Sequence, residues 1–76
     1  MTMFSRKAPP VQVGDRFVKA GDPTGKAWAT VRIWTTTDGL PHARIENSGQ
    51  QHETRIISIS ALTDPHFYLP APPASL

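Results

Sequence analysis

Residues 27–37, AWATVRIWTTT, constrain the fold of this chain more than any other stretch. Small and β-branched residues alternate there with polar and aromatic ones, a content that is favoured in β-strands. Successive side chains of a strand point to opposite faces, so we predict a strand here. One face is predicted to hold Ala29, Val31 and Ile33. The same period of two places Trp28 and Trp34 together on the opposite face.

Four more strands are predicted from shorter alternating runs and from the turn residues between them. They are expected at 11–19, 41–47, 52–60 and 66–69. The Asp38–Gly39 pair is typical of a hairpin turn, because both residue types accept a positive φ. A second turn is expected at 47–51. Residues 60–63 are predicted to form a single helical turn that Pro65 ends.

The length of 76 residues allows one small domain. Proline pairs and few large apolar side chains mark residues 1–10 and 70–76, so both are predicted to be flexible tails. A domain this small buries only about 60% of its unfolded-chain surface, which leaves little net stability. The chain has no cysteine, so disulfides and thiolate zinc sites are excluded. Self-association is therefore the expected source of additional stability.

The predicted elements indicate an all-β fold, because the chain has short strands joined by tight turns and no predicted amphipathic helix. Such strands close most readily into a small barrel. A long loop follows the first strand, three strands then form a meander, and one helical turn precedes the last strand. This is the layout of a five-stranded SH3-like small barrel, which we predict for residues 11–69.

The loop GDPTGKAW, residues 21–28, contains glycines and a lysine but lacks the spacing of a phosphate-binding loop. A P-loop requires G-x-x-x-x-G-K-[ST] followed by a helix. Here Gly21 and Gly25 are one residue too close, and Ala27 stands where the hydroxyl should be. The loop is therefore predicted to connect two strands, with Lys26 in solvent.

Four pieces of the chain carry a family resemblance: VGDRFVK at 13–19, KAW at 26–28, the alternating strand that ends in Trp34, and TRIISISAL at 54–62. Their layout resembles that of the plasmid-borne type II dihydrofolate reductases, SH3-like barrels that assemble as homotetramers around one active pore. The resemblance implies that Lys19 matches the family's ligand-contacting lysine. It also implies that Ile56 matches the isoleucine of the pore segment V-Q-I-Y. At the glutamine and tyrosine of that segment, this chain has Arg55 and Ile57.

The leading hypothesis is a non-enzymatic protein-interaction or self-assembly module. Trp28, Trp34 and Ile56 are predicted to form the exposed apolar centre of its binding surface, because aromatic anchors carry a large share of interface energy. Arg32 and Arg55 are predicted at the rim, where charges set orientation. The strand pattern leaves one alternative open, in which one or both tryptophans cap the barrel core.

Two other function classes stay open. A reductase-like homotetramer would place Lys19, Arg55 and Ile56 around a shared pore that attracts NADPH, an anionic cofactor. No cofactor is expected under the leading hypothesis. A protein that binds single-stranded nucleic acid would stack bases on the tryptophans beside basic side chains. Those basic residues are Lys19, Lys26, Arg32, Arg44 and Arg55.

Metal binding and membrane insertion are not predicted. His42, His52 and His66 do not have the spacing that would let two of their imidazoles bind the same metal ion. No run approaches the ~18 apolar residues that a membrane span requires, and no apolar segment typical of a secretion signal follows Arg6 and Lys7. We therefore expect a cytoplasmic protein whose partner is another protein or a further copy of itself.

Overall fold

The alternating sequences form five antiparallel strands in the computed structural model, which describes residues 11–47, 49 and 52–72. The strands are β1 (Arg16–Lys19), β2 (Ala27–Thr35), β3 (Pro41–Asn47), β4 (Glu53–Ser58) and β5 (Tyr68–Ala71). One short helix, α1 (Ile59–Leu62), precedes the last strand. Residues 1–10 and 73–76, which belong to the predicted tails, lie outside the described residues.

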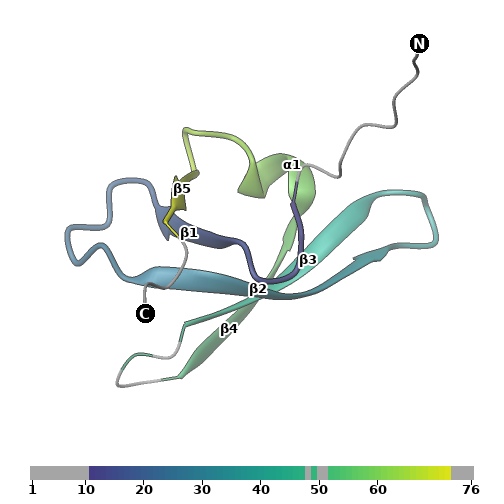
Figure 1. The fold of residues 1–76 in the computed structure, drawn as a ribbon. Coiled ribbons are helices and arrows are strands. Elements are labelled where there is room, and N and C mark those ends of the chain that lie inside the picture. The colour runs from purple at the N-terminus through teal and green to yellow at the C-terminus, as the bar shows by residue number, and fades with distance from the viewer. Residues whose placement is uncertain (1–10, 48, 50–51, 73–76) are drawn as a thin grey trace, which may run out of the picture.

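The strands pair in the order β4-β3-β2-β1-β5, and every neighbouring pair is antiparallel. The sheet curls into a half-barrel, as Figure 1 shows, and β4 and β5 are its two edges. Helix α1 packs against β3, β4 and β5. The predicted fold class is thus confirmed: the protein is all-β, with five strands and one helical turn before the last of them.

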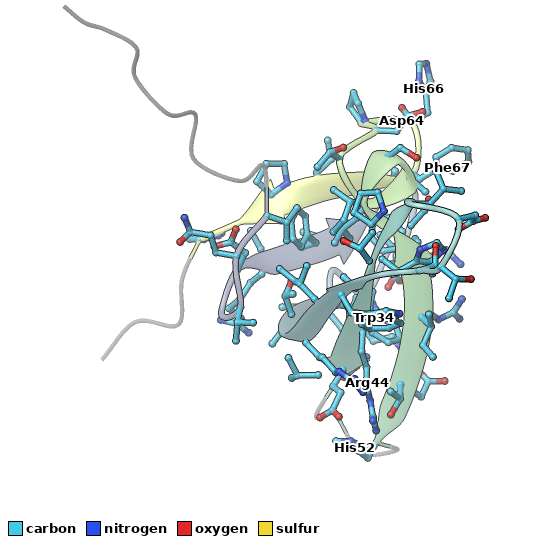
Figure 2. The ribbon with its side chains drawn as sticks, turned by 90° about the vertical axis from the view of Figure 1, so that its right-hand side faces the viewer. Trp34, Arg44, His52, Asp64, His66 and Phe67 are labelled. Carbon is cyan, nitrogen blue, oxygen red and sulfur yellow. The ribbon has the colours of Figure 1, made fainter. Side chains whose placement is uncertain are left out.

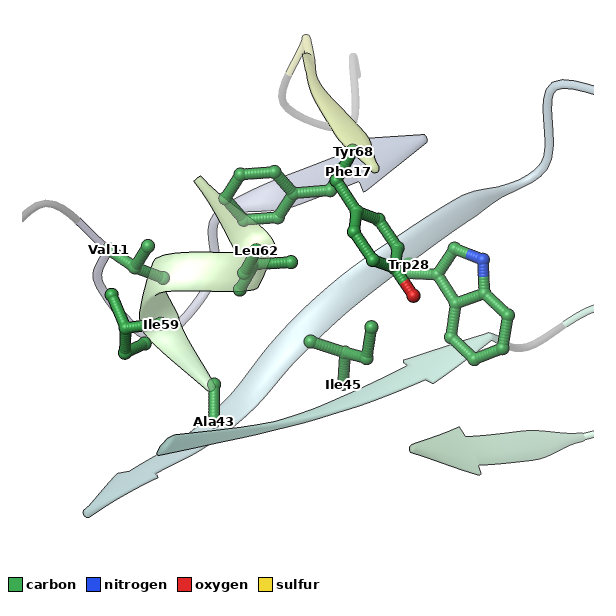
Figure 3. Close-up of a cluster of buried hydrophobic side chains, with 8 residues drawn as sticks. All are labelled: Val11, Phe17, Trp28, Ala43, Ile45, Ile59, Leu62 and Tyr68. Atoms are coloured by element: carbon green, nitrogen blue, oxygen red, sulfur yellow. The ribbon is translucent and has the colours of Figure 1, made fainter. Parts of the chain in front are cut away.

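The core fills the inner face of the curled sheet. Figure 3 shows its side chains gathered between the strands and α1. The buried apolar residues are Val11, Phe17, Trp28, Ala43, Ile45, Ile59, Leu62 and Tyr68. Removing each of the larger side chains from water contributes about 1.5–3 kcal/mol, so this one cluster supplies most of the favourable free energy of folding.

A β-bulge interrupts the pairing of β2 with β3. Thr30 pairs with Ile45, while Arg32 pairs with the adjacent residue, Arg44. Val31 therefore has no partner on β3. An extra residue of this kind reverses the in-and-out alternation for the remainder of the strand.

The bulge places the two tryptophans on opposite faces of the sheet. Trp28 precedes the bulge and lies in the core, where it is 1% exposed. Beyond the bulge, Ile33 pairs with the buried Ala43, so the next residue, Trp34, faces outward. The prediction that both tryptophans share an exposed face is wrong. A period of two holds only while each residue of a strand opposes one residue of its neighbour.

The first strand is shorter than predicted and begins at Arg16 instead of Val11. The preceding residues form a turn in which the Gln12 amide donates to the Asp15 carboxylate at 2.9 Å. The Asp15 amide donates back to the Gln12 carbonyl at 3.0 Å. Gly14, with a φ of +100°, supplies a conformation that other residues rarely adopt. Val11 nevertheless joins the core.

The predicted turn at Asp38–Gly39 is present as part of a longer connection, residues 36–40. Only Gly39 has a positive φ, and its amide donates to the Thr36 carbonyl at 2.9 Å. The Thr36 hydroxyl donates to the Asp38 carboxylate. This hydrogen bond is the largest cause of the lowered pKa of Asp38.

The helix and the last strand are each displaced slightly from their predicted positions. Helix α1 begins at Ile59 because the Ser58 hydroxyl accepts a hydrogen bond from the Ala61 amide at 3.2 Å and so caps the helix. Strand β5 extends through Pro70 to Ala71, both of which were predicted to lie in the C-terminal tail. Proline is tolerated there because β5 is an edge strand with only one neighbour.

Candidate functional site

The residues predicted to form one binding surface lie on two faces of the sheet. On β4, Arg55 pairs with the buried Ile45, whereas the next residue, Ile56, pairs with Arg44. Arg44 pairs in turn with Arg32. Since paired residues share a face, the outward set is Trp34, Ile56 and Arg32. The inward set is Trp28, Arg55 and Lys19.

The outer face, as we call it, consists of Trp34, Ile56, Arg32, Arg44 and His42. The Arg32 guanidinium carbon lies 5.2 Å from the centre of the Trp34 ring, a cation–π distance. The His42 ring stacks on the same indole, with centroids 6.3 Å apart and an interplanar angle of 27°. Ile56 is 66% exposed. The outer face therefore combines an indole that two neighbouring side chains contact with an exposed aliphatic side chain.

The outer face is bordered by a charged group of the opposite sign. The Glu46 carboxylate forms an ion pair with Arg44, 3.5 Å from its Nε atom, and lies 3.4 Å from His52 Nε2. Figure 2 shows Trp34, Arg44 and His52 toward one end of the molecule. Asp64, His66 and Phe67 lie at the other end. Positive and negative side chains thus sit side by side next to the apolar centre.

A second candidate site, which we call the seam pocket, lies on the inner face where the half-barrel stays open. It is a depression of about 330 Å³ between the β1–β2 loop and the first half of β4. The loop GDPTGKAW, which sequence spacing excludes as a P-loop, forms one of its walls. The side chains that give the pocket its chemistry are Lys19, Asp22, Lys26, Trp28, Glu53 and Arg55.

Two cations lie over the buried indole of the seam pocket. The Lys26 ammonium is 5.8 Å and the Arg55 guanidinium carbon 5.2 Å from the centre of the Trp28 ring. Lys26 also forms an ion pair with Glu53 at 3.1 Å. The loop connects two strands and Lys26 is exposed, both as predicted, and the Lys26 ammonium also reaches β4 through its ion pair with Glu53.

Asp22 organises the loop that forms the wall of the seam pocket. Its carboxylate accepts hydrogen bonds from the Thr24 amide at 2.9 Å and from the Thr24 hydroxyl at 2.8 Å. The hydroxyl bond, followed by the amide bond, lowers the pKa of Asp22 below its ordinary value of 3.8. Asp22 is therefore ionised and held at the pocket wall at neutral pH.

Replacing Thr24 with valine should raise the pKa of Asp22 toward 3.8, because the largest cause of its lowering is removed. A carboxylate whose pKa is lowered by folding stabilises the fold above its unfolded pKa, and this contribution disappears as the pH falls through the folded pKa. Carbon-detected NMR titration of the aspartates measures the change. Asp64, whose lowered pKa comes from His66, serves as the internal control. An unchanged Asp22 titration would contradict the assigned cause.

An apolar hollow of about 270 Å³ adjoins the seam pocket and shares Lys19 and Ala20 with it. Its other lining residues come from β4, α1 and the segment leading into β5. They are Ile57, Ala61, His66, Phe67 and Tyr68. The open side of the half-barrel is therefore polar at one end and apolar at the other.

The residues assigned to each alternative function are divided between the two faces of the sheet. Of the residues assigned to a reductase-like pore, Lys19 and Arg55 line one pocket, while Ile56 points to the opposite face. The predicted nucleic-acid surface is likewise divided, with Lys19, Lys26 and Arg55 inside and Arg32 and Arg44 outside. Neither set forms one continuous site within this chain.

Glu53 and Asp22 belong to the seam pocket but were not predicted as site residues. The Lys26–Glu53 pair joins residues 27 positions apart in the chain, so no local spacing could have indicated it. Within the described ranges, no three potential metal-ligating side chains gather. No helix in those ranges has both the length and the apolar character needed to cross a membrane.

Comparisons with known proteins found no relative of this chain. No protein-family model, curated protein or solved structure matches this chain, so the resemblance to type II dihydrofolate reductases rests on the four sequence pieces alone.

Proposed function

We propose that this protein is a small non-enzymatic self-assembly module that associates with a second copy of itself through the outer face. The observation that carries the proposal is the placement of Trp34 and Ile56 on the same outward surface. Trp34 pairs with His42 and Ile56 pairs with Arg44, and these two partners lie two residues apart on β3. Aromatic and aliphatic anchors of this kind dominate the energy of protein interfaces.

The geometry of Trp34 suits an interface anchor. Arg32 and His42 contact its ring, so the indole is held before any partner arrives. A side chain that is already ordered loses less conformational entropy on binding, which leaves more of the contact energy for affinity. Ile56 adds accessible aliphatic area to the same face.

The charges around the outer face favour a second copy of the chain as the partner. A twofold interface must be complementary to itself, which requires both signs of charge on one patch. Arg44 and Glu46 lie two residues apart on β3 and on the same face. An antiparallel second copy can place each of them against the opposite charge. The small core gives such association a stabilising role.

Replacing Trp34 with alanine should weaken self-association at least about tenfold in dissociation constant, because hot-spot tryptophans contribute about 2 kcal/mol or more. Sedimentation velocity over a concentration series measures the effect. The matched control is Phe67→Ala, which removes an aromatic side chain that is 56% exposed and lies at the other end of the molecule in Figure 2. A parent protein that stays monomeric at millimolar concentration would overturn the proposal, as would equal weakening by both variants.

A further inference from the structure

We propose that the seam pocket binds an organic anion, whose carboxylate or phosphate group contacts Arg55 and the Trp28 indole N–H and whose apolar part enters the apolar hollow. This inference concerns the inner face and is independent of self-association through the outer face. It rests on an unpartnered donor, on the charges around that donor, and on the apolar hollow beside it.

The unpartnered donor is Trp28 Nε1. Trp28 is 1% exposed, and its indole N–H has no hydrogen-bond partner among the described residues. A buried N–H without an acceptor costs about 1–3 kcal/mol, and buried indole N–H groups ordinarily find a partner. Figure 3 shows the indole at the edge of the core cluster, with its nitrogen turned away from the other labelled side chains. Trp28 belongs to the lining of the seam pocket, so an acceptor in that pocket would satisfy the donor.

The charges of the seam pocket favour a negative ligand. Lys26 is paired with Glu53, and Asp22 stays ionised at the pocket wall, so Lys19, Lys26 and Arg55 outnumber the two carboxylates of the lining. Within the described part of the chain, Lys19 and Arg55 form no ion pair, which leaves two cationic side chains at the pocket without an acidic partner. A guanidinium group is the side chain best suited to hold a carboxylate or phosphate, because it offers two parallel donors.

Two flexible side chains lie over the indole on the pocket side. They belong to Lys26 and Arg55, both of which are exposed residues. Long exposed side chains exchange rotamers within nanoseconds. An incoming anion can therefore draw Arg55 toward itself and approach the indole from the seam pocket.

The size and polarity of the two hollows define the class of ligand. The seam pocket, about 330 Å³, and the apolar hollow, about 270 Å³, meet at Lys19 and Ala20. Together they reach the size range of ligand pockets for small organic molecules. Phe67 and Tyr68 supply aromatic surface to the apolar end. The arrangement fits an acid with one aromatic or aliphatic group and does not call for a bare inorganic ion.

The chain offers a direct test, because it contains two tryptophans and so gives two indole N–H signals in a ¹⁵N–¹H NMR spectrum. Replacing Trp34 with phenylalanine assigns them. Titration with 3-phenylpropionate or with phenyl phosphate should shift the Trp28 indole signal in a saturable manner, with a dissociation constant of about 1 mM or tighter. The Trp34 signal, which comes from the outer face, should stay in place.

The controls separate the parts of the proposal. 3-Phenylpropanol, which is neutral, should not shift the Trp28 signal. Arg55→Gln, a substitution of an exposed residue, should weaken binding at least about tenfold, and Lys19→Gln should weaken it to a smaller extent. A response to phenylpropionate alone would assign a carboxylate ligand, and a response to phenyl phosphate alone would assign a phosphate ester. Either result supports the site.

Two outcomes would overturn the proposal. One is a Trp28 signal that responds to neither anion. The other is a response that the neutral alcohol reproduces or that survives Arg55→Gln unchanged. Failure of this site would leave self-association untouched, because sedimentation of the Trp34→Ala variant reports on the opposite face.

Discussion

Replacing Trp28 with alanine is expected to destabilise the fold by about 3–5 kcal/mol, the usual cost of removing a buried aromatic side chain. Trp28 is 1% exposed and belongs to the hydrophobic core cluster shown in Figure 3. A small domain has a total stability near the lower end of the ordinary range of about 5–15 kcal/mol. The variant should therefore be largely unfolded at 37 °C.

Urea unfolding followed by circular dichroism measures this loss of stability, and Trp34→Ala is the matched control. Both tryptophans lie on β2, but only Trp28 packs in the core. The control should cost less than about 1.5 kcal/mol when it is measured at a concentration where the parent protein is monomeric. Comparable losses of stability from the two variants would contradict the assignment of the two indoles to opposite faces of the sheet. They would also contradict the reversal of the in-and-out alternation at the Val31 bulge.

Introducing an aspartate at Ile45 should abolish folding at neutral pH. Ile45 is 0% exposed and occupies the centre of the core. The new carboxylate must either lose its hydration without gaining a partner or be protonated far from its ordinary pKa, and both cost several kcal/mol. Losses above about 4 kcal/mol are characteristic of a buried, unpaired charge.

Ile56→Asp supplies the control on the neighbouring strand. Ile56 is 66% exposed on the outer face, so the aspartate stays hydrated there and the folded monomer should be retained. Dispersion of the amide proton NMR signals distinguishes the two variants in dilute solution. If Ile45→Asp remained folded, the assignment of the inner face would be wrong. The same Ile56→Asp variant should also dissociate the self-assembled form.

Much of the fold followed from short-range patterns. The presence of the strands β2 and β3 and of the Asp38–Gly39 turn depends on residues close together in the sequence, and each of them is found in the structure. The predicted boundaries of α1 and β5 were less accurate, because a helix cap determines where α1 begins and an edge position lets β5 include a proline. Ser58 starts α1 earlier than expected, and Pro70 is accommodated in β5 because nothing pairs with its outer side.

The candidate sites could not be predicted in the same way. Trp28, Trp34 and Arg55 were singled out from the sequence, but a single surface was expected to hold all three. The extra residue in β2 becomes visible only when the strand is paired with β3, because the count of residues on the partner decides which one is left over.

By itself, the sequence determined the strand content, the order of the elements and the Asp38–Gly39 turn, because these depend on side-chain period and on local backbone preferences. Only the tertiary structure decided which tryptophan is buried and which residues meet in the seam pocket. The reason is that Lys26 and Glu53 approach each other from segments 27 residues apart, through the curl of the whole sheet and not through any local spacing.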